Sequence, residues 1–291
     1  MFKEITAKTI LHYHKRQFAT KWDANIYRGC GHNCRYCFAQ YSHKYLENTD
    51  FFNDIYVKTN SPELLYKELG KIKWDKSPVN VCGISDCYQP VEREYKIMPK
   101  VIKSFIKKRN PLVITTKSTL LLRDIDLIKE LIKVAEVSII VSVSTLDEEK
   151  RRLIEPNAAP TLDRLKMLKK FNEIGCKTSV LFVPIIPFIS DDQENLDAIF
   201  RITKEYNLGS INAWPLHLRG NTKKVFFDFL QNNFSDLLPK FKKLYQTKNA
   251  SKEYCKDLFF SIEKLKDKYN IHSNYKPTES IKKPIQTSLF D

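Results

Sequence analysis

Three cysteines in one short loop are the residues of this sequence whose spacing points most directly to chemistry. Cys30, Cys34 and Cys37 follow a C-x3-C-x2-C spacing, and the aromatic Tyr36 stands directly before the last of them. Three thiolates this close together can converge on one iron–sulfur cluster, because cysteine is the soft ligand that such clusters select. An electron-transfer [4Fe–4S] cluster normally has four cysteine ligands, so three cysteines leave one iron open for a small molecule.

Zinc is the alternative for closely spaced cysteines, but zinc sites usually contain paired C-x2-C units or a second group of ligands. His32 and His43 could each donate a nitrogen, although His32 lies inside the cysteine loop, where its geometry would be awkward. The other four cysteines are scattered along the chain and form no C-x2-C unit: Cys82, Cys87, Cys176 and Cys255. The spacing therefore favours an iron–sulfur cluster.

This spacing, with its preceding aromatic, resembles that of the radical S-adenosylmethionine (SAM) enzymes. In that superfamily the open iron of a [4Fe–4S] cluster takes the amino and carboxylate groups of SAM. The reduced cluster then cleaves SAM to a 5′-deoxyadenosyl radical, which abstracts hydrogen from a substrate. The resemblance implies the same two cofactors here, and a reductant such as flavodoxin or ferredoxin.

Length and composition favour one large core in a reducing compartment. The chain has 291 residues, of which 42% are hydrophobic, and α/β barrels of this size are commonly single domains. Its seven cysteines do not resemble the disulfide framework of a secreted protein. The N-terminus lacks the apolar core of a signal peptide, and no stretch approaches about eighteen uninterrupted apolar residues. We therefore expect a cytoplasmic protein without a membrane span.

The net charge is strongly positive, at +15 with an isoelectric point of about 9.3. Such a charge favours an anionic partner such as nucleic acid, because phosphates attract clustered lysine and arginine side chains. Lysine-rich surfaces also occur on proteins that bind no nucleic acid, so charge alone favours this partner only slightly.

Short apolar, β-branched runs alternate with segments of helical periodicity over most of the chain. Ser61 before Pro62 predicts a helix start, with the serine as its cap, and Gly175 predicts a helix end. The predicted strands are residues 24–28, 79–84, 112–116, 137–144, 177–183 and 210–216. The predicted helices are residues 62–72, 95–108, 121–134, 161–174 and 192–206. Such alternation implies a parallel sheet with helices outside it.

Six strand–helix units are too few for a closed eight-fold barrel. They match the partial (β/α)6 barrel of the TIM type that is typical of radical SAM cores, so we predict an α/β fold of this class with a helical C-terminal extension. In such barrels the chemistry lies at the C-terminal ends of the strands. We divide the chain into an N-terminal lead-in, a radical SAM core barrel, a helical basic extension and a flexible tail, at residues 1–24, 25–222, 223–271 and 272–291.

Several segments resemble the spore photoproduct lyase-like branch of radical SAM proteins, often described as DNA repair photolyases. They are N-I-Y-R-G-C-x-H-x-C-x-Y-C-F-A (25–39), S-D-x-Y-Q-P-V-E (85–92), I-T-T-K-S (114–118), R-D-I-D-L-I (123–128), S-V-S-T-L (142–146) and E-P-x-x-x-P (155–160). The match spans roughly residues 5–220. The cysteine loop is specific for the superfamily, whereas the second and third segments are specific for this broad branch.

The resemblance implies SAM contacts at the ends of the predicted strands, around the barrel mouth beside the cluster. In the lyase, matching serines and a lysine contact SAM, since a lysine suits the carboxylate and hydroxyls suit ribose or carboxylate oxygens. Tyr36 and Phe38 flank the last cysteine and could pack against adenine. Ordinary strand-end hydroxyls and aromatic packing are the alternative interpretations. The candidates at the strand ends are Ser85, Asp86, Lys117, Ser142 and Ser144.

The chain departs from the lyase at the residue that returns hydrogen to the product radical. The lyase has a cysteine three residues before the aspartate of its Ser-Asp pair, and here that position is Gly83. Cys87, which follows Asp86, could reach the mouth from its loop, whereas Cys82 would point to the opposite face of the strand. This departure weighs against the spore-specific thymine dimer and leaves a related photoproduct or another substrate equally open.

The C-terminal tail carries a second motif. The sequence Q-T-S-L-F resembles the bacterial sliding-clamp-binding pentapeptide Gln-x-(Ser/Asp)-Leu-Phe, through Gln286, Ser288, Leu289 and Phe290. In an unstructured tail the two apolar residues can enter a preformed pocket while the glutamine makes polar contacts. The alternatives are a chance match of five residues and a tail that docks on its own domain.

The leading interpretation is a radical SAM enzyme, of the lyase type, that acts on damaged DNA. A lesion would have to be swung into the barrel mouth, as other base-modifying enzymes require. A second interpretation keeps the radical chemistry but changes the substrate to RNA, a protein side chain or a metabolite. A third is a nucleic-acid-binding and clamp-binding protein whose cluster is only structural. SAM turnover, and its dependence on nucleic acid, would separate the three.

Overall fold

Six parallel strands pair in sequence order and form the frame of the fold, in a computed structural model that describes residues 2–15, 20–43, 46, 50–81 and 83–271. They are β3 (Trp22–Ala24), β6 (Val79–Val81), β7 (Leu112–Thr116), β8 (Val137–Val143), β9 (Lys177–Ile185) and β10 (Ser210–Pro215). An antiparallel strand, β2 (Leu11–Tyr13), pairs with β3, and the described sheet runs from β10 to β2. The predicted α/β fold with six parallel strands is therefore confirmed.

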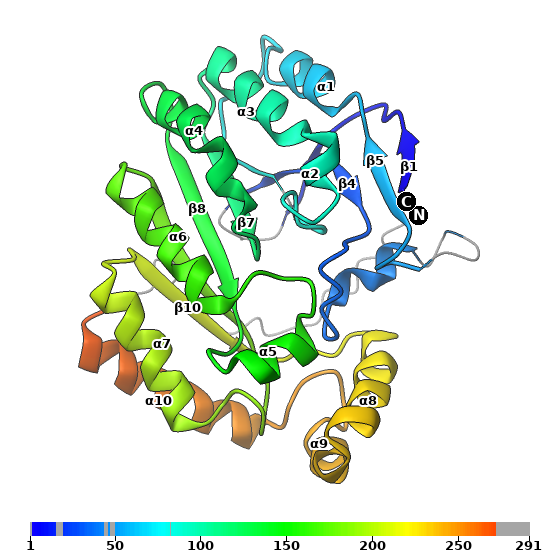
Figure 1. Cartoon of the computed structure of the whole chain (residues 1–291), viewed down its shortest axis with the longest axis vertical. Coiled ribbons are helices and arrows are strands. Elements are labelled where there is room, and N and C mark those ends of the chain that lie inside the picture. Colours follow the sequence, from blue (N-terminus) through cyan, green and yellow to red (C-terminus); the bar gives the residue numbers. More distant parts are fainter. Residues whose placement is uncertain (1, 16–19, 44–45, 47–49, 82, 272–291) are drawn as a thin grey trace.

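The helices that connect the strands form an arc outside the sheet, which Figure 1 shows for α3, α4, α6 and α7. On α3, Val101, Ile102 and Phe105 recur at helical spacing and are buried, so the amphipathic period accounts for this helix. The connecting helices are α1 (Ser61–Glu68), α2 (Glu92–Tyr95), α3 (Ile97–Lys108), α4 (Ile125–Ile132), α5 (Glu148–Ile154), α6 (Thr161–Glu173) and α7 (Gln193–Glu205), with the 3-10 segments η1 (Phe38–His43) and η2 (Leu120–Asp124).

The predicted helices exist, but one of the two predicted helix boundaries is wrong. Gly175 follows α6 with a φ of +101°, as expected, and its N–H donates to Asn172 O at 3.0 Å. Ser61 is the first residue of α1 and does not cap it. The cap position is Asn60, whose side chain instead bonds the backbone of Ala7 in both directions at 2.9 Å. The short, highly charged helix α5 was not predicted.

The predicted first strand, 24–28, is wrong as a single element. The chain leaves the large sheet after β3 and joins a small sheet through β4 (Tyr27–Arg28), which pairs with β5 (Ile55–Lys58) and through it with β1 (Phe2–Ile5). Asn25 fixes the crossing, because its side chain accepts from Ile84 N at 3.1 Å and its carbonyl accepts from Lys58 Nζ at 2.7 Å. The predicted lead-in thus contains strands of both sheets.

The C-terminal extension is helical, as predicted, and packs on the core. It comprises α8 (Thr222–Asn233), η3 (Ser235–Leu237), α9 (Leu238–Leu244) and α10 (Lys252–Tyr269). Side chains of α8 and α9 form a second apolar cluster that includes Cys34 and Tyr36. Among the described residues, no helix combines the length and the apolar character that a membrane span requires. The proposed domain boundaries stay a prediction.

Candidate active site

The three cysteines lie in the loop that joins β4 to η1. The backbone folds back on itself there, and Cys37 N donates to Cys34 O at 3.1 Å. Gly29 begins the loop with a φ of +87°, and a Cβ at this position would lie 2.7 Å from Asp54 O. Only glycine fits such a conformation without displacing the backbone. The residue before the first cysteine is therefore set by backbone geometry.

Two side-chain amides hold this loop in place. Gln89 accepts from Gly31 N at 2.8 Å and donates to Gly29 O at 3.1 Å. Asn157 donates from its side chain to Gly31 O at 2.8 Å, and its backbone N–H donates to His32 O at 3.3 Å. These bonds satisfy backbone groups that have no regular element to pair with, so they fix the loop.

Asp86 ties the loop to the ends of β6 and β7. Its carboxylate contacts His32 Nε2 at 3.0 Å and accepts from Thr116 Oγ1 at 2.8 Å, Lys117 N at 2.7 Å and Tyr88 N at 2.8 Å. Burial alone would raise the pKa of Asp86, but His32 and the backbone donors outweigh burial and lower this pKa. Both oxygens of this carboxylate therefore have protein partners, and Asp86 joins the cysteine loop to the ends of β6 and β7.

The three thiols share buried surroundings and influence one another. Burial, followed by the charges of Asp86 and Cys37, raises the pKa of Cys30 to about 12. Burial also raises the pKa values of Cys34 and Cys37, while the positive charge of Lys117 acts to lower both. Iron ligation requires thiolates, so binding of a cluster would release these protons.

The donor set fits an iron–sulfur cluster. The three cysteines stand within eight positions of one loop, and Cys37 N donates to Cys34 O at 3.1 Å. Among the described residues, no three His, Cys, Asp or Glu side chains form a group that could hold a single metal ion. The fit to a cluster therefore rests on the number, the softness and the proximity of the thiols.

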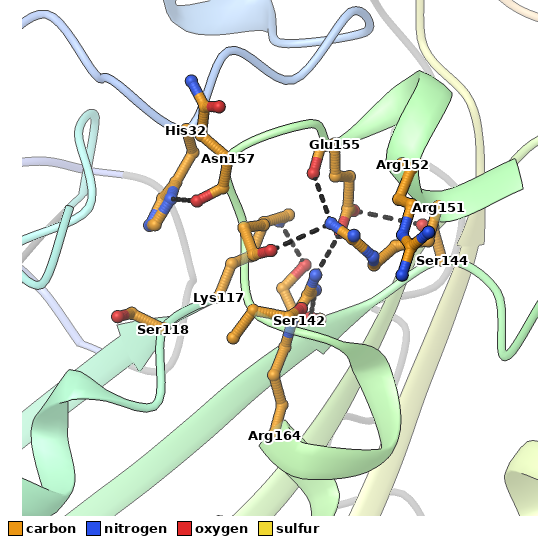
Figure 2. A network of polar contacts seen from close by, with 12 residues as sticks. His32, Lys117, Ser118, Ser142, Ser144, Arg151, Arg152, Glu155, Asn157 and Arg164 are labelled. Atoms are coloured by element: carbon orange, nitrogen blue, oxygen red, sulfur yellow. Dashed lines mark hydrogen bonds and ion pairs between the residues drawn. The ribbon is translucent and has the colours of Figure 1, made fainter. Parts of the chain in front are cut away.

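Lys117 brings a positive charge from the end of β7 to this loop, as Figure 2 shows beside Ser142. Its Nζ donates to Ser142 Oγ at 2.6 Å, and that hydroxyl donates to Val183 O at 3.0 Å. The same Nζ lies 5.7 Å from the ring centre of Tyr36. Two of the predicted SAM-binding residues, Lys117 and Ser142, are therefore in contact beside the cysteines.

Glu155 is the centre of a second, buried group at the same place (Figure 2). Its carboxylate accepts from Tyr36 OH, from Ser144 Oγ at 3.0 Å and from Arg164 Nη2 at 2.6 Å. Burial acts to raise the pKa of Glu155, but Arg164, Lys117 and the hydrogen bonds lower it to about 2. Glu155 therefore stays a buried anion, paired with a buried guanidinium.

The remaining candidates for SAM binding differ in accessibility. Ser85 is buried and donates to Tyr27 O at 2.8 Å, and Ser144 is bound to Glu155. Tyr36 is also buried, whereas Phe38 is 51% exposed and stacks on the half-exposed Tyr41 with ring centres 6.4 Å apart. Roles of these residues toward SAM stay predictions.

Of the two candidates for hydrogen return, Cys87 lies within the described residues and is not an exposed thiol. Cys87 is 1% exposed, lies in the main apolar core and is disulfide-bonded, so it carries no S–H in this state. Cys82 and the tail motif lie outside the described residues. At Gly83, the position of the lyase cysteine, a Cβ would collide with the carboxylate of Asp23. This carboxylate accepts from Asn80 Nδ2 at 3.0 Å, which holds it there.

Sequence reasoning missed the residues that hold the site together. Gln89 and Glu155 belong to segments that resemble the lyase-like branch. The sequence does not show which residues their side chains contact. The sequence presents His32 only as a possible zinc ligand. Nothing in it indicates that Arg164 has a buried partner, because this residue lies within an ordinary helical pattern. Asn157 likewise stands at an unspecified position of its motif.

A cavity of about 580 Å³ borders the cysteine loop. It shares Gly31, Gln89 and Asn157 with the contacts that clamp the loop, and Arg93 and Phe52 also line it. Neither Lys117 nor any of the three loop cysteines lines this space, so we do not assign it to SAM.

Comparisons with known proteins agree with this geometry. Residues 24–198 match the family model of the radical SAM superfamily. An uncharacterized protein from Mycobacterium tuberculosis (strain ATCC 25618 / H37Rv) is 31% identical over 299 residues, which cover 99% of this chain and 88% of that protein. An uncharacterized protein from Methanocaldococcus jannaschii is 28% identical over 244 residues, which cover 84% of this chain and 86% of that protein.

Two solved structures share the fold. Spore photoproduct lyase complexed with dinucleoside spore photoproduct has a TM-score of 0.69 at 14% identity, covering 92% of this chain and 79% of the lyase chain. SuiB from Streptococcus suis, bound to precursor peptide SuiA, has a TM-score of 0.55 at 15% identity, covering 87% of this chain and 47% of SuiB. Because the family model covers more than half of its residues, the chain belongs to the radical SAM superfamily, whose members use a [4Fe–4S] cluster and SAM.

Proposed function

We propose that this radical SAM enzyme holds its cluster through Cys30, Cys34 and Cys37 and processes lesions in DNA. The observation that carries the proposal is the position of Lys117, whose Nζ lies 5.7 Å from the ring of Tyr36, inside the cysteine motif. When bound, the cluster supplies the electron that cleaves SAM reductively and yields a 5′-deoxyadenosyl radical. Reduced flavodoxin or ferredoxin in the cytoplasm is the proposed electron source.

The side chains at the strand ends then divide into two roles. Lys117 would offer its charge to the carboxylate of SAM, and the hydroxyl of Ser142, which accepts from Lys117 Nζ at 2.6 Å, would keep that ammonium in place. Asp86 accepts from the backbone N–H of Lys117 and contacts His32. Asp86 therefore connects the end of β7 to the cysteine loop. Phe38 is the aromatic that can reach adenine, because its ring is exposed directly after Cys37.

DNA is the proposed substrate on two grounds. The net charge of +15 favours a polyanion, and the half-exposed Tyr41, which stacks on Phe38, offers an aromatic face beside the cysteine loop. The lyase that shares the fold was solved with a dinucleoside photoproduct. A lesion, swung out of the duplex, would present its bases to the strand ends.

We propose Cys87 in its reduced form as the thiol that returns hydrogen to the product radical, with Cys82 as the second candidate. Cys87→Ala should then still cleave SAM but should stall or divert the product, because the radical lacks its donor. Product analysis under reducing, anaerobic conditions checks this. Normal product from the Cys82→Ala, Cys87→Ala double variant would eliminate both residues.

Radical modification of a peptide or protein is the second candidate function. It is favoured by the shared fold of SuiB, which was solved with its precursor peptide. RNA and metabolites belong to the same class of alternatives. In a different class, the protein would bind nucleic acid and the sliding clamp and keep a structural cluster that does not turn over SAM.

Anaerobic reconstitution tests the proposal. The protein should bind about four irons with sulfide, and Cys30→Ala, Cys34→Ala or Cys37→Ala should each abolish formation of 5′-deoxyadenosine. Ultraviolet-irradiated DNA should increase SAM cleavage above the level with unirradiated DNA or RNA. Equal turnover with all three would reject the DNA substrate but keep the radical chemistry. About one equivalent of zinc without sulfide would reject both.

A further inference from the structure

The buried carboxylate of Glu155 joins three parts of the fold at one point. Through Tyr36 it holds the cysteine loop, through Ser144 Oγ at 3.0 Å it holds the end of β8, and through Arg164 Nη2 at 2.6 Å it holds α6. Glu155 and Arg164 are both 0% exposed. Such a pair is expensive to bury, and hydrophobic residues of similar volume are often at least as stable. Stability alone therefore does not explain why a charged pair occupies this position.

Within this group, Lys117 is the cation whose hydrogen-bond partner is not a carboxylate. Arg164 is neutralised by Glu155, and its other nitrogens donate to Ser142 O at 2.8 Å and Ala159 O at 2.6 Å. Lys117 Nζ is hydrogen-bonded to a neutral hydroxyl of Ser142. The cysteine loop thus faces two buried carboxylates, Asp86 at His32 and the Arg164-paired Glu155 at Tyr36, and the ammonium of Lys117, whose charge is available to a bound carboxylate.

We propose that Glu155 is a positioning residue that fixes the cluster loop through Tyr36 and sets the reduction potential of the cluster through its charge. A fixed anion close to the thiolates opposes the addition of an electron, and hydrogen bonding and net charge around a cluster are the levers by which proteins tune it. The proposal concerns the cofactor, so it stands whether the substrate is DNA, RNA or protein.

The chain contains a matched control for this group. Glu92 is also 0% exposed, accepts from Tyr27 OH at 2.5 Å and pairs with Arg123 Nη2 at 2.6 Å. The second group therefore has the same tyrosine, glutamate and arginine chemistry. Its tyrosine belongs to β4 and not to the cysteine motif, and Glu155, but not Glu92, is among the charges that raise the pKa of Cys34. Loss of either glutamate should destabilise the fold, but only loss of Glu155 should change the reduction potential of the cluster.

The test compares Glu155→Gln with Glu92→Gln in the reconstituted full-length enzyme. Redox titration followed by electron paramagnetic resonance should show easier reduction in Glu155→Gln, by about tenfold in the equilibrium constant, or ~59 mV toward positive potential. Glu92→Gln should keep the wild-type potential while its melting temperature falls. Equal potentials in both variants and the wild type would overturn the electrostatic part of the proposal.

A second pair keeps the proposal testable if Glu155→Gln fails to fold. Tyr36→Phe and Tyr27→Phe each remove one hydroxyl that is bound to a buried glutamate, and both leave the ion pairs intact. Tyr36→Phe should lose iron to a chelator several times faster than Tyr27→Phe, because only Tyr36 links the loop to Glu155. Equal rates of iron loss would show that the contact is structural only and would overturn the positioning role.

Discussion

Single residues around the cysteine loop divide into those that hold the backbone and those that offer charge. Asp86 and Ser85 have their oxygens bonded to protein donors or carbonyls, so they hold strand ends to loops. Lys117 differs, because its ammonium is bound to a neutral hydroxyl and lies beside the thiols. Lys117 is therefore the residue that we propose to supply the positive charge for the carboxylate of SAM.

Lys117→Ala should weaken SAM binding by roughly tenfold or more, since a charge-assisted hydrogen bond contributes about 1.5–3 kcal/mol. The absorption spectrum of the cluster should stay unchanged, because no iron ligand is lost. Anaerobic equilibrium binding measures the affinity. Lys223→Ala is the control, since that ammonium donates to Tyr245 O at 2.7 Å and not to the strand ends. Unchanged SAM affinity in Lys117→Ala would count against the assignment.

At the scale of elements, the site depends on short connections held by distant side chains. The cysteine loop has no regular secondary structure from Gly29 to Cys37, and Gln89 and Asn157 supply the bonds that a strand or helix would supply itself. The turn into this loop tolerates no side chain at Gly29, whereas the position two residues later does.

Gly29→Ala should prevent stable incorporation of iron, because the left-handed conformation costs a non-glycine residue about 1–2 kcal/mol and the new Cβ meets Asp54 O at 2.7 Å. Gly31→Ala should retain the cluster, since its Cβ would lie 3.5 Å from Pro90 in ordinary contact. Iron and sulfide analysis after anaerobic reconstitution distinguishes the two. Equal iron content would show that the turn is not limiting.

The contact between α10 and α7 gives a pH-dependent prediction. Hydrogen bonds from Lys268 at 2.6 Å and Tyr269 at 2.8 Å reach the carboxylate of Asp197, and the bond from Lys268 is the main reason that the pKa of Asp197 is lowered. A carboxyl with a lower pKa when folded stabilises the protein above its unfolded pKa, and this contribution is lost as the pH falls through the folded value. Because the site is near the surface, the effect should be small.

Asp197→Asn should therefore lower the melting temperature at pH 7, and the difference from the wild type should shrink toward pH 3. Thermal unfolding followed by circular dichroism at both pH values measures this. Asp126→Asn is the control, because its partner Lys129 lies on the same helix and ties no second element. A difference that stays constant with pH would reject the role of this carboxylate.

At the scale of the whole molecule, the C-terminal helices complete the site. Phe226, Phe241 and Tyr245 pack in one apolar cluster with Cys34 and Tyr36, so the extension covers the cysteine loop. Thr222, at the start of α8, donates to Cys37 O at 3.3 Å. The extension is therefore part of the surroundings of the cysteine loop, while the tail motif follows beyond α10 in the sequence.

A peptide covering residues 282–291 should bind the bacterial sliding clamp weakly, because a short unstructured segment must be ordered on binding. Leu289→Ala with Phe290→Ala should remove binding, since apolar anchors in a fitted pocket carry most of the energy. Thr287→Ala is the control and should have little effect. Fluorescence anisotropy measures the affinity, and SAM cleavage by the full-length double variant should persist. No binding at high micromolar concentration would favour the alternative of a tail docked on its own domain.

The sequence by itself predicted an iron–sulfur role for the cysteine loop, and it determined the order of the parallel strands and of the longer helices between them. Both depend on short-range patterns: the spacing of Cys30, Cys34 and Cys37, and apolar periods that persist within each element. It also placed Lys117 and Ser142 at strand ends, which the parallel sheet brings together. It did not divide the first strand, because the crossing at Asn25 depends on Lys58 and Ile84.

Only the tertiary structure decided how the site is held. Tyr36 and Glu155 are separated by 119 positions in the chain, and His32 and Asp86 by 54. A buried polar group must find a partner, but which partner depends on the segments that the fold brings into contact. The sequence pattern shows which residues need partners. The packing of β8, α5 and α6 around the cysteine loop determines which partners they contact.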